Sequence, residues 1–184
     1  MTPDVERAIA SLTTRPLALD AAQPLLPRAG GLYAWWIVNQ ALAGVPANRH
    51  PTQVGLDLLY IGIAPNGPTS KSNLRSRVIG NHMRGNIAAS TFRRTLAALL
   101  LDVLGLTPVK SGGKVQLPEE QNAQLSRWQH QHLRLTWHAA TEPWLLESAV
   151  IGKLSPPLNL DGNDHHPFYR TVSDARRRLQ QAAR

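Results

Sequence analysis

The sequence predicts a mixed α/β (α+β) domain, because three strand-like segments alternate with segments of helical spacing. Residues 32–38 form a nearly continuous apolar run rich in Trp and Tyr, which is typical of a strand covered on both faces. Residues 57–63 follow as a second strand. Residues 133–138 alternate between polar and apolar side chains and indicate a third strand.

The chain before the first strand divides into a helix and a connector. Residues 3–12 have the spacing of a short amphipathic helix. Three prolines interrupt the stretch that follows, so we expect residues 1–28 to form an N-terminal helix and a connector. These prolines are Pro16, Pro24 and Pro27.

The first two strands are joined by a long connection. Alternate side chains of a strand point to the same face, so Tyr33, Trp35 and Ile37 share one face of the first strand. Residues 39–55 are rich in proline, glycine and polar residues. A connection of this length could reach a bound substrate.

Two helices are expected between the second and third strands. Ser70 or Ser72 can cap a helix that runs to about Met83 and carries Arg77 and His82. The second helix spans residues 91–104, where apolar side chains recur at helical spacing and two arginines point outward. These arginines are Arg93 and Arg94, and Gly105 fits the end of the helix.

The remaining segments are a loop and two further helices. Residues 107–118 suggest a mobile loop around two consecutive glycines, and residues 119–130 a polar helix. Thr141 can cap a helix that starts at Pro143 and runs to about residue 154. Glu147 lies at the border of the apolar face of that helix, so its carboxylate should point toward the sheet. A half-buried carboxylate needs a partner, either a metal ion or an arginine.

Composition indicates one domain with an acidic partner. The chain has 184 residues, a formal net charge of +8 and a sequence pI of about 10.8. Long-range attraction to phosphates is therefore expected, although a merely soluble basic protein would have the same charge. No acid lies between Asp57 and Asp102, and this stretch contains Lys71, Arg75, Arg77, Arg84, Arg93 and Arg94.

Several classes of site are excluded. The chain has no cysteine, so it carries neither a disulfide nor a thiolate metal site nor a cysteine nucleophile. Residues 1–12 lack the basic start and apolar block of a signal peptide, and no apolar run approaches the roughly 20 residues of a membrane span. We expect a soluble, cytoplasmic protein with no membrane partner.

The order of several short motifs carries the strongest functional signal. Gly31-Leu32-Tyr33 and Tyr60-Ile61-Gly62 are followed by Leu74-Arg75-Ser76-Arg77, His82, Glu147 and Asn159. Over residues 29–160 this order resembles the GIY-YIG nucleases. The resemblance implies a small three-stranded antiparallel sheet flanked by helices, and hydrolysis of DNA phosphodiester bonds with one divalent metal. Residues 161–184 would form a C-terminal loop and a basic helix.

The resemblance also assigns roles to the motif residues. Glu147 would hold Mg²⁺ or Mn²⁺, a hard cation that prefers oxygen ligands. Arg77 would contact nonbridging phosphate oxygens, with Arg75 as the alternative. The other assigned residues are Tyr33, which orients or deprotonates the attacking water; Tyr60 beside it; His82, which relays protons; and Asn159, which braces the site.

Simpler roles stay open for the same residues. Both tyrosines could be core aromatics, Arg77 a solvated helix charge and Asn159 a turn residue. Residues 161–166 could hold a second metal but fit a turn better. The arginines at 176–178 fit an exposed helix, with phosphate contact as second choice. Expected contacts to the DNA backbone are Lys71, Arg75, Arg84, Arg93 and Arg94.

The function within the family is less defined. Residues 81–86 and 90–96 resemble a stand-alone bacterial subgroup of the family. The sequence favours a DNA endonuclease. The alternatives are a nucleic-acid-binding regulator that cleaves poorly, and a nuclease restricted to RNA or single-stranded DNA.

Overall fold

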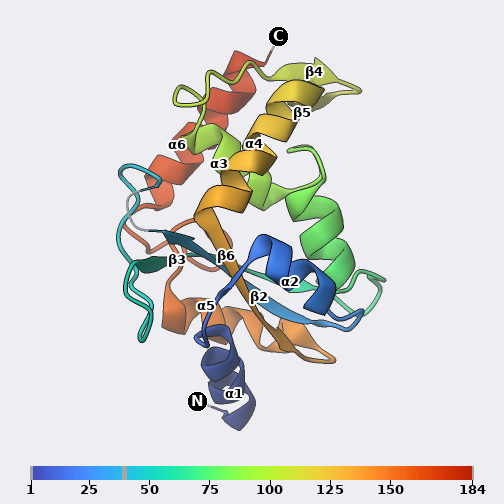
Figure 1. Ribbon diagram of the computed structural model, residues 1–184, viewed down its shortest axis with the longest axis vertical. Coiled ribbons are helices and arrows are strands. Elements are labelled where there is room, and N and C mark those ends of the chain that lie inside the picture. The colour runs from blue at the N-terminus through green and yellow to red at the C-terminus, as the bar shows by residue number, and fades with distance from the viewer. Residues whose placement is uncertain (1, 39–40, 184) are drawn as a thin grey trace.

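A four-stranded antiparallel sheet lies at the centre of the computed structural model, which describes residues 2–38 and 41–183 (Figure 1). The strand order is β1-β6-β2-β3. The three long strands are β2 (Gly31–Val38), β3 (Leu56–Ala64) and β6 (Leu133–Ala139). They confirm the predicted α/β fold class and the three strands expected from the sequence.

The fourth strand, β1 (Leu17–Ala18), corrects the three-stranded sheet that the resemblance implied. Leu17 pairs with Leu135 and Ala18 with Arg134, at the free edge of β6. Two residues are too few to produce a periodic pattern, so the strand was hidden in the expected connector. The same connector contains a short helix, α2 (Leu19–Leu25), with Pro24 inside it.

Helices cover both faces of the sheet because β2 is apolar on both sides. Leu32, Ala34 and Trp36 pack with α1 (Pro3–Leu12) and α5 (Glu147–Leu154). Figure 1 shows these two helices below the sheet. Tyr33, Trp35 and Ile37 all belong to the core on the opposite face, as predicted.

The opposite face carries most of the helices. Figure 1 shows α3 (Thr91–Leu99), α4 (Glu119–His132) and α6 (Tyr169–Ala182) above the sheet. Helix α6 lies against α3 and buries Val172 and Leu179. It is therefore a packed part of the fold rather than an exposed extension.

The helix that carries Arg77 and His82 starts later than expected and is wider than an α-helix. It is the π-helix η1 (Ser76–Met83). The Asn73 side chain accepts a hydrogen bond from the Ser76 backbone N–H at 2.9 Å, so Asn73 rather than Ser70 or Ser72 organises its start. Wide helical turns are frequent at functional sites.

Two other segments differ from the sequence-based expectation. The expected loop at 107–118 contains a hairpin of β4 (Val109–Ser111) and β5 (Lys114–Gln116), because Gly112 and Gly113 adopt the positive φ values that a tight turn requires. The helix expected from Pro143 to residue 154 is divided into η2 (Pro143–Leu145) and α5, and the Thr141 side chain caps neither.

The start of α3 at Thr91 was predicted correctly, but the helix ends at Leu99 and not at Leu104. The Ser90 hydroxyl caps the helix by accepting a hydrogen bond from the Arg93 N–H. The regular helix stops at Leu99, and irregular turns lead to Gly105, which has a φ of 59°. Positive φ is accessible to glycine at little cost and explains its place here.

Candidate active site

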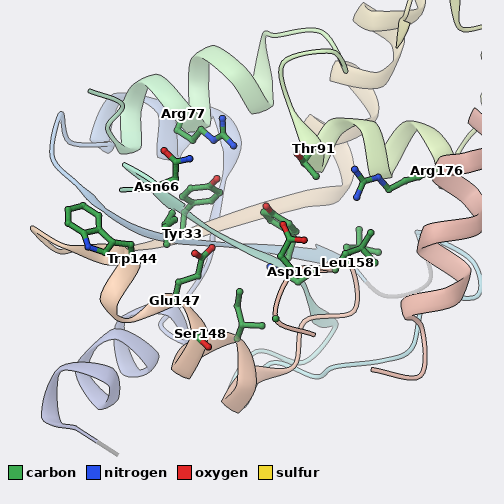
Figure 2. A pocket seen from close by; sticks show the side chains of 16 residues that line it. Tyr33, Asn66, Arg77, Thr91, Trp144, Glu147, Ser148, Leu158, Asp161 and Arg176 are labelled. Carbon is green, nitrogen blue, oxygen red and sulfur yellow. The ribbon is translucent and has the colours of Figure 1, made fainter. Parts of the chain in front are cut away.

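A pocket of about 380 Å³ gathers side chains from segments that are far apart in the sequence. Figure 2 shows it between the sheet, η1 and the start of α5. Five of the six residues predicted to be catalytic line it: Tyr33, Tyr60, Arg77, Glu147 and Asn159. The sixth, His82, lies directly behind Tyr33.

Tyr33 projects from the middle of β2 on the face covered by η1. Its side chain is buried, and its hydroxyl oxygen lies 2.6 Å from His82 Nε2. Burial raises the pKa of Tyr33, and nearby Tyr60 raises it further, while the charge of Arg77 lowers it. The phenol is therefore neutral at pH 7 in the protein as it stands.

Tyr60 reaches the pocket from β3, where it pairs with Trp35 of β2. Its ring packs against Phe92, with the ring centroids 5.1 Å apart. Burial raises the pKa of Tyr60 to about 12, although the positive charge of Arg77 opposes the shift. Tyr60 is thus both a wall of the pocket and part of the core.

His82 is fully buried and holds a hydrogen bond at each ring nitrogen. Nε2 contacts the Tyr33 hydroxyl, and Nδ1 lies 2.6 Å from Ser90 Oγ. Burial, together with the charges of Arg77 and Arg93, lowers the pKa of His82 well below its ordinary value. The imidazole is therefore neutral at pH 7.

Arg77 and Glu147 approach the pocket from opposite sides. Figure 2 shows Arg77 entering from η1 and Glu147 entering from the first turn of α5, with Tyr33 between them. Glu147 is half-buried and points toward the sheet, as the helical spacing predicted. Burial raises the pKa of Glu147, and the carboxylate of Asp161 raises it further.

Asn159 ties the loop after α5 to the outer edge of β3. Its Nδ2 donates to the Ile61 carbonyl at 2.8 Å, and its Oδ1 accepts from the Ile61 N–H at 2.9 Å. The side chain thus replaces a missing neighbouring strand at this edge. Since both ends of the amide bond the backbone, Asn159 shapes the pocket wall.

Of the two arginines considered for phosphate contact, only Arg77 lines the pocket. The Arg75 guanidinium donates to the backbone carbonyls of Gln23 at 3.0 Å and Leu26 at 3.3 Å. Arg75 therefore anchors the connector to η1 and leaves Arg77 as the pocket cation.

The expectation that Arg93 points outward is wrong. The Arg93 side chain is fully buried and donates to the carbonyls of His82 at 3.2 Å and Met83 at 2.9 Å. It also bonds side chains of α4, including Asn122. Arg93 lies three and four residues before the buried Leu96 and Ala97, so it belongs to the inner stripe of α3.

The remaining predicted contacts to nucleic acid lie at or near the surface. Lys71 and Arg84 are exposed, and Arg94 is partly exposed. Arg84 donates to the Gln23 side chain, and Arg94 donates to the Ile87 and Ala88 carbonyls. None of the three lines the pocket.

Two charged residues of the pocket, Asp161 and Arg176, were considered in the sequence analysis but were not among the predicted site residues. Figure 2 shows Arg176 reaching toward the pocket from α6. Asp161 belongs to the stretch that was considered as a second metal site. Among the described residues, no group of three or more His, Asp or Glu side chains could hold a metal ion.

A family model of the GIY-YIG catalytic domain matches residues 31–178. The chain belongs to the GIY-YIG family. The matched range extends into α6, beyond residue 160, whereas the proposed domain boundaries themselves stay a prediction. No curated protein and no solved structure gave a significant match.

Membership of the GIY-YIG family indicates a nuclease-type function and a nucleic acid as substrate. GIY-YIG nucleases generally depend on a metal. Within residues 2–38 and 41–183, no helix is both long and apolar enough to cross a membrane.

In the pocket of this GIY-YIG protein, the Glu147 carboxylate suits a metal cation. Glu147 has no ion-pair partner among the described residues, and its raised pKa reflects burial and a second carboxylate, Asp161, nearby. A cation would relieve both effects. Mg²⁺ requires only one or two protein carboxylates because it keeps water and phosphate ligands.

Proposed function

We propose that this GIY-YIG protein is an endonuclease that hydrolyses DNA phosphodiester bonds, with Glu147 holding one Mg²⁺ or Mn²⁺ ion. The observation that supports this most strongly is the placement of Tyr33 between Arg77 and Glu147 in one pocket. A phenol, a cation and a carboxylate converge there from β2, η1 and α5.

Each side chain has a distinct task in this proposal. Arg77 donates hydrogen bonds to the nonbridging phosphate oxygens, for which the planar guanidinium is better suited than an ammonium. Glu147 binds the metal, which when bound offsets the charge of the phosphate and of the departing 3′ oxygen. Asp161 lines the same pocket and would supply an outer ligand through water.

Tyr33 orients the attacking water from the floor of the pocket. Its high pKa shows that the phenol does not ionise unaided at neutral pH. Arg77 already lowers this pKa, and a cation at Glu147 acts in the same direction. His82, held at 2.6 Å, fixes the direction of the phenolic oxygen.

The deciding experiment compares wild type with Glu147→Ala and Glu147→Gln on supercoiled plasmid, linear duplex, single-stranded DNA and RNA. Each substrate is incubated with Mg²⁺, Mn²⁺ or EDTA. We expect metal-dependent cutting of DNA by wild type and a loss of at least about a hundredfold in both variants, because the metal ligand is removed. Both variants should still bind DNA in EDTA.

Other outcomes identify the alternatives. Metal-dependent cutting by Glu147→Ala would remove Glu147 from the metal site. Binding with steep salt dependence but no cutting of any substrate would favour the alternative of a nucleic-acid-binding protein over that of an enzyme. Cutting of RNA alone would redefine the substrate.

A further inference from the structure

A second groove, of about 400 Å³, meets the pocket at Arg176. It runs between α6 and the β4–β5 hairpin, which lie near one another at the C-terminal end of the molecule (Figure 1). Four basic side chains line it: Arg94, Lys114, Arg176 and Arg177. Arg176 thus lines both the end of the groove and the wall of the pocket.

The charged side chains that line the groove are all positive. No carboxylate is among its described lining residues. Arg177 pairs with Asp174 at 3.0 Å. Both side chains are mostly exposed, so this ion pair is weak and neutralises the charge of Arg177 only in part. No ion pair involves Arg94, Lys114 or Arg176 within the described part of the chain.

Arg94 and Arg176 repel each other across the groove. Burial and the charge of Arg94 together lower the pKa of Arg176, although Asp161 opposes this. Arg94 is held in place by its bonds to the Ile87 and Ala88 carbonyls. Two guanidiniums that repel each other form a site that an anion would stabilise.

We propose that this groove binds the nucleic-acid strand that continues from the cleavage pocket, with Arg94, Lys114 and Arg176 contacting successive backbone phosphates. This rests on the proposed function, because the strand is that of the substrate. The contacts would be independent of sequence and would set the orientation of the strand. Arg94 therefore keeps its predicted role as a contact to the nucleic-acid backbone, whereas Arg93 is buried and does not have this role.

Binding to a fluorescent DNA oligonucleotide in EDTA, measured at several salt concentrations, tests the groove without requiring cleavage. The double variant Arg94→Gln/Lys114→Gln removes two groove cations. Arg127→Gln/Lys153→Gln removes the same charge from exposed positions on α4 and α5, outside the groove. The slope of log K against log salt should fall by about 1.4 to 1.8 in the groove variant, because two phosphate contacts are lost.

We also expect the affinity of the groove variant to fall at least about tenfold below that of the control variant. Equal affinities and equal slopes in the two double variants would contradict the proposal that the groove binds nucleic acid. If wild type binds DNA through the groove but cuts no substrate, the proposed function is contradicted and the proposal that the groove binds nucleic acid still holds.

A separate observation concerns a buried chain of hydrogen bonds behind the pocket. Ser90 Oγ lies 2.6 Å from His82 Nδ1, and His82 Nε2 lies 2.6 Å from the Tyr33 hydroxyl. Ser90 Oγ also accepts the Arg93 backbone N–H at 3.0 Å. Ser90, His82 and Tyr33 are all buried.

The donors and acceptors of these hydrogen bonds determine which nitrogen of His82 carries the proton. The Arg93 N–H can only donate, so it cannot accept the proton of the Ser90 hydroxyl. Within the described structure, the one acceptor bonded to that hydroxyl is His82 Nδ1. A neutral imidazole that accepts at Nδ1 carries its proton on Nε2.

We infer that Ser90 is a positioning residue that holds His82 as the Nε2–H tautomer, so that His82 donates its hydrogen bond to the Tyr33 oxygen. The phenolic proton then remains available to the pocket. A donor aimed at the phenolic oxygen favours negative charge on it. His82 therefore assists Tyr33 without acting as its base.

The tautomer can be measured by ¹⁵N NMR of the histidine side chains at pH 7. The signals of His82 are identified by their loss in His82→Gln. We expect the Nε2–H form in wild type and in Ser90→Thr, which keeps the hydroxyl, but a mixture of tautomers in Ser90→Ala. An Nδ1–H form in wild type would overturn the assignment, whatever the variants do.

Ser90→Gly separates this role from helix capping, because glycine at an N-cap costs only a few tenths of a kcal/mol relative to serine. It should lose the fixed tautomer while the protein stays folded. If cleavage is observed, its pH profile should shift to higher pH in Ser90→Gly and be restored in Ser90→Thr. A profile that is unchanged in Ser90→Gly would contradict the link to Tyr33.

Discussion

Gly62 lies directly opposite Tyr33 across the β2–β3 ladder, and the phenol of Tyr33 occupies the space above it. A Cβ atom at position 62 would lie 2.4 Å from the Tyr33 hydroxyl oxygen and 2.6 Å from Cζ. These separations are far below van der Waals contact. The last residue of Tyr60-Ile61-Gly62 and the last residue of Gly31-Leu32-Tyr33 are therefore fitted to each other.

Gly62→Ala should displace the Tyr33 ring and lower the cleavage rate at least about tenfold. Overpacking of this kind typically costs 1–3 kcal/mol of stability. A double-mutant cycle with Tyr33→Ala measures the contact, since alanine at 62 should cost about 1 kcal/mol less once the phenol is removed. Additive losses of stability would show that the two residues do not interact.

Arg77→Lys should reduce cleavage about a hundredfold at saturating DNA while the protein keeps its stability. An ammonium retains the charge but cannot form the paired hydrogen bonds of a guanidinium. Arg75→Lys is the matched control, because Arg75 bonds backbone carbonyls away from the pocket. Single-turnover rates for both variants separate the two arginines, and equal losses would contradict the assignment.

Stability should decrease as the pH falls below about 6.5, in part because of His82. The folded protein holds the pKa of His82 below its ordinary value, so the unfolded chain binds a proton that the folded one rejects. The stabilisation is complete above pH 6.5 and is lost by at most about 1.4 kcal/mol per pH unit below it.

Urea unfolding at pH 7 and pH 5 measures this effect. His82→Gln should show a shallower decrease, by up to about 2 kcal/mol between these pH values. His138 and His166 also have lowered pKa values through burial, so the difference between the variant and wild type is the informative quantity. Parallel decreases would mean that His82 titrates normally.

Arg93→Ala should destabilise the protein by about 3 kcal/mol or more, because several buried acceptors lose the hydrogen bonds that the guanidinium donates. The carbonyls of His82 and Met83 and the side chain of Asn122 would all be affected. Arg94→Ala, the neighbouring control, should cost less than about 1 kcal/mol. Chemical denaturation measures both, and equal stabilities would exclude a structural role for Arg93.

The sequence was most informative where a pattern is long or where motifs occur in a fixed order. The apolar run of β2 predicted a strand buried on both faces, and the ordered motifs identified five pocket residues. Glu147 could be oriented from helical spacing alone, because its helix is apolar on one side only.

The missed features depend on contacts between distant segments. Strand β1 exists because the edge of β6 is free to pair with it, and two residues are too few to show a strand pattern in the sequence. Arg93 occupied a position on the inner stripe of its helix, but its charge suggested a solvent-facing residue. Its burial became visible only once α4 and η1 supplied the acceptors. Arg176 required the docking of α6 on α3.

The pocket draws on residues from Tyr33 in β2 to Arg176 in α6, and this has a consequence for biosynthesis. A ribosome releases the strands with both tyrosines and the helix with Arg77 long before it reaches Glu147, Asn159 and the last helix. A partly synthesised chain that ends before α5 therefore lacks Glu147, Asn159 and Arg176 of the pocket. Under the proposed function, such a chain lacks the carboxylate that would hold the metal and cannot cleave a nucleic acid.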